Sequence, residues 1–212
     1  MGAGDRGTLF VISAPSGTGK STLARRLLES VPHLRFSVSF TTRPRRAGEE
    51  NGRDYEFVDD GRFDAMVAAG GFLEWARVFA HRYGTGKQAT DAVLATGNSL
   101  LLDIDVQGAR QVKSREPDAV SVFILPPDFA SLKERLARRG SEDANALSLR
   151  LGEARREAME YDRFDYVVVN ADLEDAVSEL TSIVRAESAR TARRRNRVNK
   201  ILSTFPDPGS GV

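Results

Sequence analysis

Short apolar runs recur along the chain, separated by stretches in which apolar residues return with helical spacing. The runs at 8–13, 100–104, 120–125 and 166–169 are rich in leucine, isoleucine and valine, and polar or turn residues bound each of them. Such runs are typical of strands buried on both faces. After the first run, Leu23, Leu27 and Leu28 share one face of a helix. The alternation predicts an α/β fold, a parallel sheet covered by helices on both faces.

Two segments interrupt the alternation, and a basic segment ends the chain. Residues from about 38 to 97 mix short strand patterns with charged loops, and residues from about 127 to 161 are typical of polar helices. Residues 189–212 are rich in arginine and then in proline and glycine. This composition predicts the end of a helix followed by a disordered tail. The arginine run at 193–197 is expected to be a solvated helix end rather than an RNA contact.

Composition narrows the possible functions. Of 212 residues 41% are hydrophobic, and 31 basic residues nearly balance 30 acidic ones, so no overall field attracts nucleic acid. The chain has no cysteine and only two histidines, His33 and His81, which excludes disulfides, thiolate catalysis and histidine metal centres. No apolar run approaches the roughly 20 residues that span a bilayer, and the first residues are not typical of a signal peptide. We therefore expect a cytoplasmic protein with no membrane, nucleic-acid or obligate protein partner.

The turn after the first apolar run carries the first chemical signal. It fits the P-loop pattern except at its first position, where alanine replaces glycine. Two glycines permit the positive φ angles with which N–H groups surround phosphate oxygens at a helix N-terminus. Lys20 supplies charge to the β- and γ-phosphates, and the Ser21 hydroxyl suits Mg²⁺. The flanking strand and helix favour nucleotide binding over an ordinary glycine-rich turn. The expected ATP contacts are Ala14, Pro15, Ser16, Gly17, Thr18, Gly19, Lys20, Ser21 and Thr22.

A P-loop predicts a nucleotide but no particular reaction, so the acceptor site must lie elsewhere. An arginine-rich stretch at 43–54 contains a proline and two glycines that break any helix. Guanidinium groups bind phosphate oxygens in a bidentate manner, and a tyrosine hydroxyl adds a donor. Arg43, Arg46 and Tyr55 could thus hold a second phosphate. The alternative, which charge alone favours, is a solvated surface loop held by salt bridges.

Two aspartates follow the apolar run at 100–102. In an open α/β sheet, ligands gather at the carboxyl ends of the strands, so Asp103 and Asp105 should face the cleft. Asp103 suits a position near Mg²⁺, with water between them. For Asp105, capping of the next helix is the alternative.

Several ordered motifs are shared with one enzyme family. Thr41, Thr42, Arg43, Arg46, Glu49, Gly52, Tyr55, Phe57 and Val58 match the guanylate kinase signature in order and spacing, and residues 72–75, 83–85, 102–108 and 169–173 match further family motifs. The chain therefore resembles guanylate kinases, which are P-loop nucleoside monophosphate kinases, over residues 7–188. One departure is Pro44 followed by Arg45, where the family commonly has Arg-x-Pro-Arg.

The resemblance implies a reaction and a division of the chain. It implies transfer of the γ-phosphoryl group of ATP to GMP or dGMP with Mg²⁺, giving ADP and GDP, in purine nucleotide metabolism. Residues 38–97 would then form the GMP-binding insert, 127–161 a mobile lid, and 189–212 a tail outside the domain.

The resemblance also implies roles for single residues. Ser39, Arg43, Arg46, Tyr55 and Tyr83 would hold the acceptor phosphate. Glu74 and Thr85 would recognise the base, with Asp103 and Asp105 close by. A carboxylate at Glu74 accepts the adjacent N1–H and 2-amino donors of guanine, and a hydroxyl at Thr85 can donate to O6. Without the resemblance, a solvent-facing Glu74 on an apolar strand would be favoured.

In the lid, Arg139 and Arg150 would close onto the transferring group, and Arg135 would contact ATP. Lys20, Arg43, Arg139 and Arg150 are therefore the candidate catalytic residues. Asn170, after the last strand, would border the adenine pocket. Arg138 is expected to be an ordinary helix-surface residue.

Two other functions remain open at this point. The first is a P-loop kinase for a ribose phosphate, which would not need Glu74 and Thr85 as a guanine site. The second is a non-catalytic interaction module, which would not need the P-loop lysine or the lid arginines. The presence of Lys20, Ser21, Arg139 and Arg150 favours an enzyme.

Overall fold

The computed structural model describes residues 5–78, 80–138 and 144–206. Within these residues, five strands form one sheet in the order β2-β7-β1-β8-β9, and every neighbouring pair is parallel. The strands are β1 (Leu9–Ser13), β2 (Leu34–Phe36), β7 (Ser99–Asp103), β8 (Val120–Leu125) and β9 (Tyr166–Val169). The four strands expected from apolar runs are confirmed. The edge strand β2 was not expected, because it is only three residues long and two of them are exposed.

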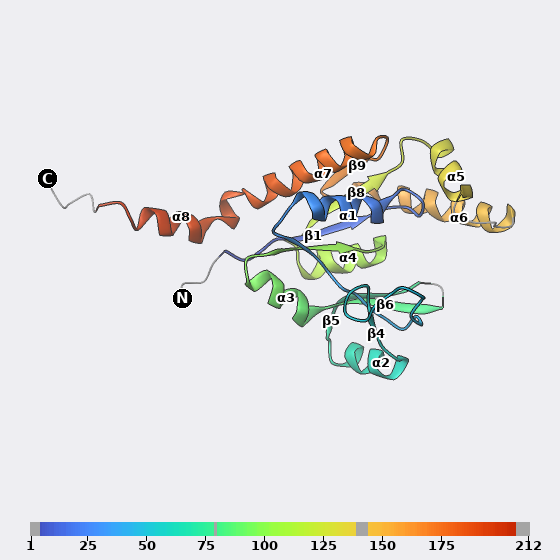
Figure 1. Cartoon of the computed structure of the whole chain (residues 1–212), viewed down its shortest axis with the longest axis horizontal. Helices are drawn as coiled ribbons and strands as arrows, with labels where there is room; N and C mark the ends of the chain where they lie inside the picture. The colour runs from blue at the N-terminus through green and yellow to red at the C-terminus, as the bar shows by residue number, and fades with distance from the viewer. Residues whose placement is uncertain (1–4, 79, 139–143, 207–212) are drawn as a thin grey trace.

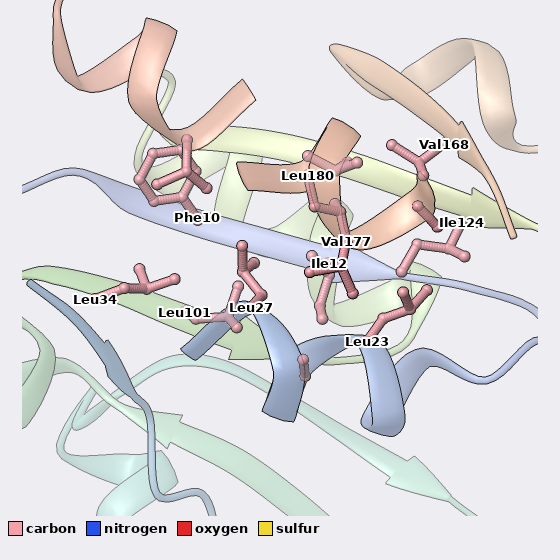
Figure 2. Close-up of a cluster of buried hydrophobic side chains, with 14 of the residues drawn as sticks. Phe10, Ile12, Leu23, Leu27, Leu34, Leu101, Ile124, Val168, Val177 and Leu180 are labelled. Carbon is pink, nitrogen blue, oxygen red and sulfur yellow. The ribbon is translucent and has the colours of Figure 1, made fainter. Parts of the chain in front are cut away.

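Helices cover both faces of the sheet, as the sequence predicted. α1 (Lys20–Ser30) and α7 (Leu173–Ser188) lie on one face, while α3 (Lys87–Ala95) and α4 (Val106–Arg115) lie on the other. Figure 2 shows Leu23 and Leu27 of α1 packing with Val177 and Leu180 of α7 around Ile12. Leu9 and Val11 of β1 face the opposite cluster. The central strand is thus buried on both sides, which fixes the P-loop that follows it.

The insert between β2 and β7 forms a second, smaller layer below the core in Figure 1. Its four described strands are β3 (Phe40–Thr41), β4 (Glu56–Phe57), β5 (Phe72–Val78) and β6 (His81–Gly86), in the order β4-β3-β6-β5. α2 (Asp60–Ala68) packs on this sheet through Phe63, whose ring stacks on that of Phe72 with centroids 4.5 Å apart. β5 also contacts α4 of the core. This contact sets how the insert faces the carboxyl edge of the main sheet.

The second insert contains α5 (Phe129–Arg138) and α6 (Ala144–Ala158), followed by a 3₁₀ turn at Tyr161–Arg163. Leu132, Leu136 and Ala154 form a small apolar cluster between the two helices. Figure 1 shows α5 and α6 at the opposite end of the molecule from α8. The predicted helical lid segment is therefore helical in the residues that the structure describes.

The structure corrects the predicted disordered tail. A 3₁₀ turn at Thr191–Arg193 and helix α8 (Arg195–Leu202) follow α7. The Asp5 carboxylate accepts hydrogen bonds from the backbone N–H groups of Asn196 (2.9 Å) and Arg197 (3.3 Å), which satisfies donors in the first turn of α8. Arg193 donates to the Thr8 hydroxyl at 3.0 Å. Long-range contacts, which composition does not reveal, order this segment; residues 207–212 lie outside the described residues.

None of the helices among the described residues is long and apolar enough to cross a membrane.

Candidate functional site

The P-loop has the conformation that its sequence predicted. Gly17 and Gly19 have φ angles of 89° and 94°, and α1 begins directly afterwards at Lys20. The Thr18 hydroxyl donates to the Pro15 carbonyl at 2.9 Å, which closes the loop on itself. Residues 14–21 line a cavity of about 260 Å³ together with Asp105 and Glu157. Backbone N–H groups and the N-terminus of α1 make this cavity suited to anionic oxygens.

Lys20, Ser21 and Asp103 meet beside this cavity. Ile12 of β1 is in register with Asp103 of β7, so both strands end at the same edge. The Lys20 ammonium lies 2.6 Å from Asp103 Oδ1, and the Ser21 hydroxyl donates to Asp103 Oδ2 at 3.3 Å. Mg²⁺ prefers oxygen ligands and usually takes one or two from the protein and the rest from phosphates and water. A hydroxyl and a carboxylate so close together fit that requirement.

Arg135 and Asn170 support the P-loop from its other side. Asn170 Nδ2 donates to the Thr18 carbonyl at 2.6 Å, and Arg135 donates to the carbonyls of Thr18 (3.2 Å) and Asn170 (3.0 Å). Both residues also line a cavity of about 430 Å³ that borders Gly17, Gly19 and Thr22. A base attached to a triphosphate on the P-loop could enter this cavity. The position fits the expected roles of Arg135 and Asn170.

Arg43 is the buried arginine of a loop that is otherwise largely exposed and held by salt bridges. The Arg43 side chain is 8% exposed, and its guanidinium binds both oxygens of Glu49, at 2.7 and 3.1 Å. It also lies 5.3 Å from the ring centre of Tyr55, and the rings of Tyr55 and Tyr83 are 5.9 Å apart. The hydrogen bond that Arg43 donates to Glu49 raises the pKa of Arg43, so the guanidinium stays charged. Three of the five predicted phosphate ligands therefore lie together, namely Arg43, Tyr55 and Tyr83.

The other two predicted phosphate ligands lie at the edge of this cluster. Arg46 is exposed, and its backbone N–H donates to Glu49 Oε2 at 2.8 Å. Ser39 is partly exposed just before β3, and its carbonyl accepts from the backbone N–H of Glu56. Glu49 thus joins the loop at two points and presents Arg43 toward the tyrosines.

Glu74 and Thr85 form a buried polar pair on neighbouring strands. Glu74 is 4% exposed, Thr85 is fully buried, and the two are in register between β5 and β6. The Thr85 hydroxyl donates to Glu74 Oε1 at 2.7 Å. Burial, reinforced by the charge of Asp105, raises the pKa of Glu74 to about 7, and the hydrogen bond from Thr85 acts in the opposite direction. The alternative of a solvent-facing Glu74 is therefore wrong.

Asp105 caps a helix and also faces the cleft. Its carboxylate accepts from the Gly108 N–H at 2.8 Å, which makes it the N-cap of α4. It also borders the phosphate cavity and acts electrostatically on Glu74. The cap thus places one carboxylate between the P-loop and the buried pair.

Sequence reasoning missed Glu157 of α6. Its carboxylate lines the P-loop cavity and accepts from the Ser16 N–H, while burial raises its pKa. The P-loop pattern contains no signal for a residue so distant in the chain.

Among the predicted lid arginines, Arg150 is partly exposed on α6, whereas Arg139 lies outside the described residues. Arg138 is exposed and pairs with Glu134, as expected for a surface residue.

Comparison with known proteins places these features in one family. Residues 6–187 match the family model described as guanylate kinase. The guanylate kinase of Syntrophotalea carbinolica is 49% identical over 92% of this chain and 93% of the relative, and that of Symbiobacterium thermophilum is 48% identical over 89% of each. The crystal structure of guanylate kinase from Anaplasma phagocytophilum aligns with a TM-score of 0.76 at 35% identity, covering 95% of this chain and 97% of the other. With its P-loop, its arginine–tyrosine cluster and its buried Glu74–Thr85 pair, this chain belongs to the guanylate kinase family.

Proposed function

We propose that this chain transfers the γ-phosphoryl group of ATP to GMP or dGMP, giving ADP and the nucleoside diphosphate. The observation that carries the proposal is the buried Glu74–Thr85 pair, which lies near the carboxyl edge that bears the P-loop. Guanine presents N1–H and a 2-amino group as adjacent donors. An ionised Glu74 can accept both, whereas adenine has no such pair of donors and would leave the buried carboxylate without these two hydrogen bonds. A buried site with unpaired polar groups discriminates strongly, by roughly 10⁴ in the better cases.

The two phosphate groups have separate binding positions. The P-loop N–H groups and Lys20 hold the donor triphosphate, with the base in the cavity beside Arg135 and Asn170. The acceptor phosphate binds at Arg43, Tyr55 and Tyr83, with Arg46 and Ser39 at the edge. The two hydrogen bonds to Glu49 favour the charged form of Arg43 and also orient its guanidinium. The N–H donors of Arg43 that bind neither Glu49 nor the Pro44 carbonyl are then available to the phosphate.

Phosphoryl transfer requires the protein mainly to position the two substrates and to stabilise the charge on the transferred group. The acceptor is already a phosphate oxygen, so no general base is required. Ser21, and Asp103 through water, would hold Mg²⁺, which would supply positive charge to the triphosphate. Lys20 stabilises the triphosphate oxygens, and Arg150 of α6 would close from the lid segment and exclude water. Arg139, the other expected lid arginine, lies outside the described residues. Lid closure thereby favours transfer to GMP over hydrolysis of ATP.

Coupled assays of ADP release with different acceptors test this proposal. GMP and dGMP should support turnover, while AMP and ribose 1,5-bisphosphate should support little. Lys20→Ala is the control that removes donor binding without touching the acceptor site. Turnover with the ribose bisphosphate at the GMP rate would overturn the guanine assignment and leave only a P-loop kinase.

A further inference from the structure

Gly108 occupies a position where the backbone does not require glycine. It is the third residue of α4, it is buried, and its φ lies outside the left-handed region. A glycine inside a helix costs about 1 kcal/mol relative to alanine. A residue that breaks a local rule in this way often serves a function. The reason for this glycine must therefore lie in what surrounds it.

The space beside Gly108 is filled by the Glu74 carboxylate. A Cβ at position 108 would lie 2.7 Å from Glu74 Oε2 and 3.3 Å from Asp105 Oδ1. The first distance is too short for a real contact, so one group would have to move. The obstacle is the end of a flexible side chain and not backbone, so the carboxylate is the group that would yield. By contrast, a Cβ added at Gly84 would meet the ring of Phe72, and one added at Gly86 would meet the ring of Phe40.

The helix itself cannot easily move away from the strand. Gln111 of α4 donates to the Trp75 carbonyl at 2.8 Å and accepts from the Trp75 N–H at 3.2 Å. Arg115 of α4 donates to the carbonyls of Phe72 and Leu73. These bonds fix α4 against the backbone on both sides of Glu74. A methyl group at position 108 would consequently displace the Glu74 carboxylate rather than the helix.

We propose that Gly108 is a positioning residue for guanine selection, which holds the Glu74 carboxylate in place because it has no side chain. The inference rests on the proposed function. One carboxylate oxygen accepts from Thr85, and the other lies against Gly108. The carboxylate is thus enclosed between β6 and α4, which fixes the orientation in which it would meet the two adjacent donors of guanine. A displacement of about 1 Å in such a contact can cost on the order of 10²-fold.

Gly108→Ala separates this role from ordinary packing. We expect KM for GMP to rise about tenfold or more and KM for ATP to stay within twofold. The midpoint of thermal unfolding should be unchanged or higher, because alanine favours the helix. Gly61→Ala is the matched control: Gly61 lies in the first turn of α2, and its Cβ would be in ordinary contact, 3.5 Å from Asp59 Oδ1. That variant should keep both KM values.

A double variant tests whether Gly108 acts through Glu74. In a Glu74→Ala background, Gly108→Ala should add less than twofold to KM for GMP, because the side chain that the new methyl group would displace is already gone. Equal effects in both backgrounds would overturn the proposal. If Gly108→Ala fails to fold, Glu74→Ala/Gly108→Ala should fold, since the obstacle is removed; failure of both would show a packing role.

Assays of the parent enzyme distinguish a failure of the proposed function from a failure of the proposed role of Gly108. Absence of GMP phosphorylation by the parent would reject the proposed function. Normal parent activity with an unchanged KM for GMP in Gly108→Ala would reject only the role of Gly108.

Discussion

Glu74→Gln should stabilise the protein at alkaline pH while it impairs GMP use. Glu74 is 4% exposed, and burial raises its pKa to about 7 from the model-peptide value of 4.5. The folded protein therefore binds one proton more than the unfolded chain between pH 4.5 and 7. Stability must fall as pH rises through this window. Glutamine has nearly the same shape, can still accept from Thr85, and carries no charge to desolvate.

The size of the effect follows from the pKa difference. At 1.36 kcal/mol per pH unit, ionisation of Glu74 costs the fold about 3 kcal/mol above pH 7. At pH 5 the loss of folding stability is only about 1 kcal/mol, because the folded protein keeps the proton while Glu74 in the unfolded chain has mostly lost it. The free energy of unfolding of the variant should therefore exceed that of the parent by about 3 kcal/mol at pH 8, which corresponds to roughly 6–12 °C in Tm for a chain of this size. At pH 5 the difference should be much smaller.

Thermal unfolding of both proteins at pH 5 and pH 8 measures this difference. Glu29→Gln, on the exposed surface of α1, is the control for loss of an acidic group. A Tm difference between Glu74→Gln and the parent that does not change with pH would refute the reasoning. A variant less stable than the parent at pH 8 would show that the ionised carboxylate has better partners than Thr85 alone.

Four further predictions follow from the described contacts. Lys20→Ala should abolish phosphoryl transfer with an unchanged Tm, and near-native turnover at saturating GMP and ATP would contradict the donor site. Arg43→Ala should weaken GMP binding about 10- to 150-fold in calorimetric titration and ATP binding little, with Arg35→Ala on the exposed edge strand as control; equal losses for both nucleotides would mean that Arg43 supports the fold. Below pH 7, kcat/KM for GMP should fall about tenfold per pH unit, because protonated Glu74 loses an acceptor; a flat profile between pH 5.5 and 7 would argue against an ionised Glu74 in binding. Asp5→Ala should accelerate amide hydrogen exchange in residues 195–202 alone, and unchanged exchange there would show that Asp5 does not cap α8.

Local patterns were sufficient to predict the P-loop and, among the described strands of the core sheet, all except the edge strand β2. β1, β7 and β8 are continuous apolar runs because both of their faces are covered. The edge strand β9 is also a continuous apolar run, although Val167 and Val169 are exposed. The P-loop conformation depends on Gly17 and Gly19, so its geometry is encoded within a few residues. The insert strands β3 and β4 have two residues each, which is too short for any periodic signal.

Long-range contacts set the features that sequence reasoning missed. Burial of Glu74 depends on α4 and β6, and an acid on an apolar strand is more often solvent-facing. Glu157 reaches the P-loop from α6, and the order of α8 depends on Asp5 at the other end of the chain. The roles of single residues in catalysis are still predictions, because geometry shows where they lie and kinetics must show what they do.

The most direct test of guanine recognition compares GMP, inosine monophosphate and AMP as acceptors for the parent and for Glu74→Gln. Inosine monophosphate lacks only the 2-amino group, so it isolates one of the two donors that Glu74 should accept. We expect the parent to prefer GMP over inosine monophosphate by at least about fivefold in kcat/KM, the cost of one unpaired buried group, and to use AMP very poorly. In Glu74→Gln the preference for GMP over inosine monophosphate should shrink, and AMP should stay poor. A parent enzyme that uses AMP as well as GMP would contradict the account.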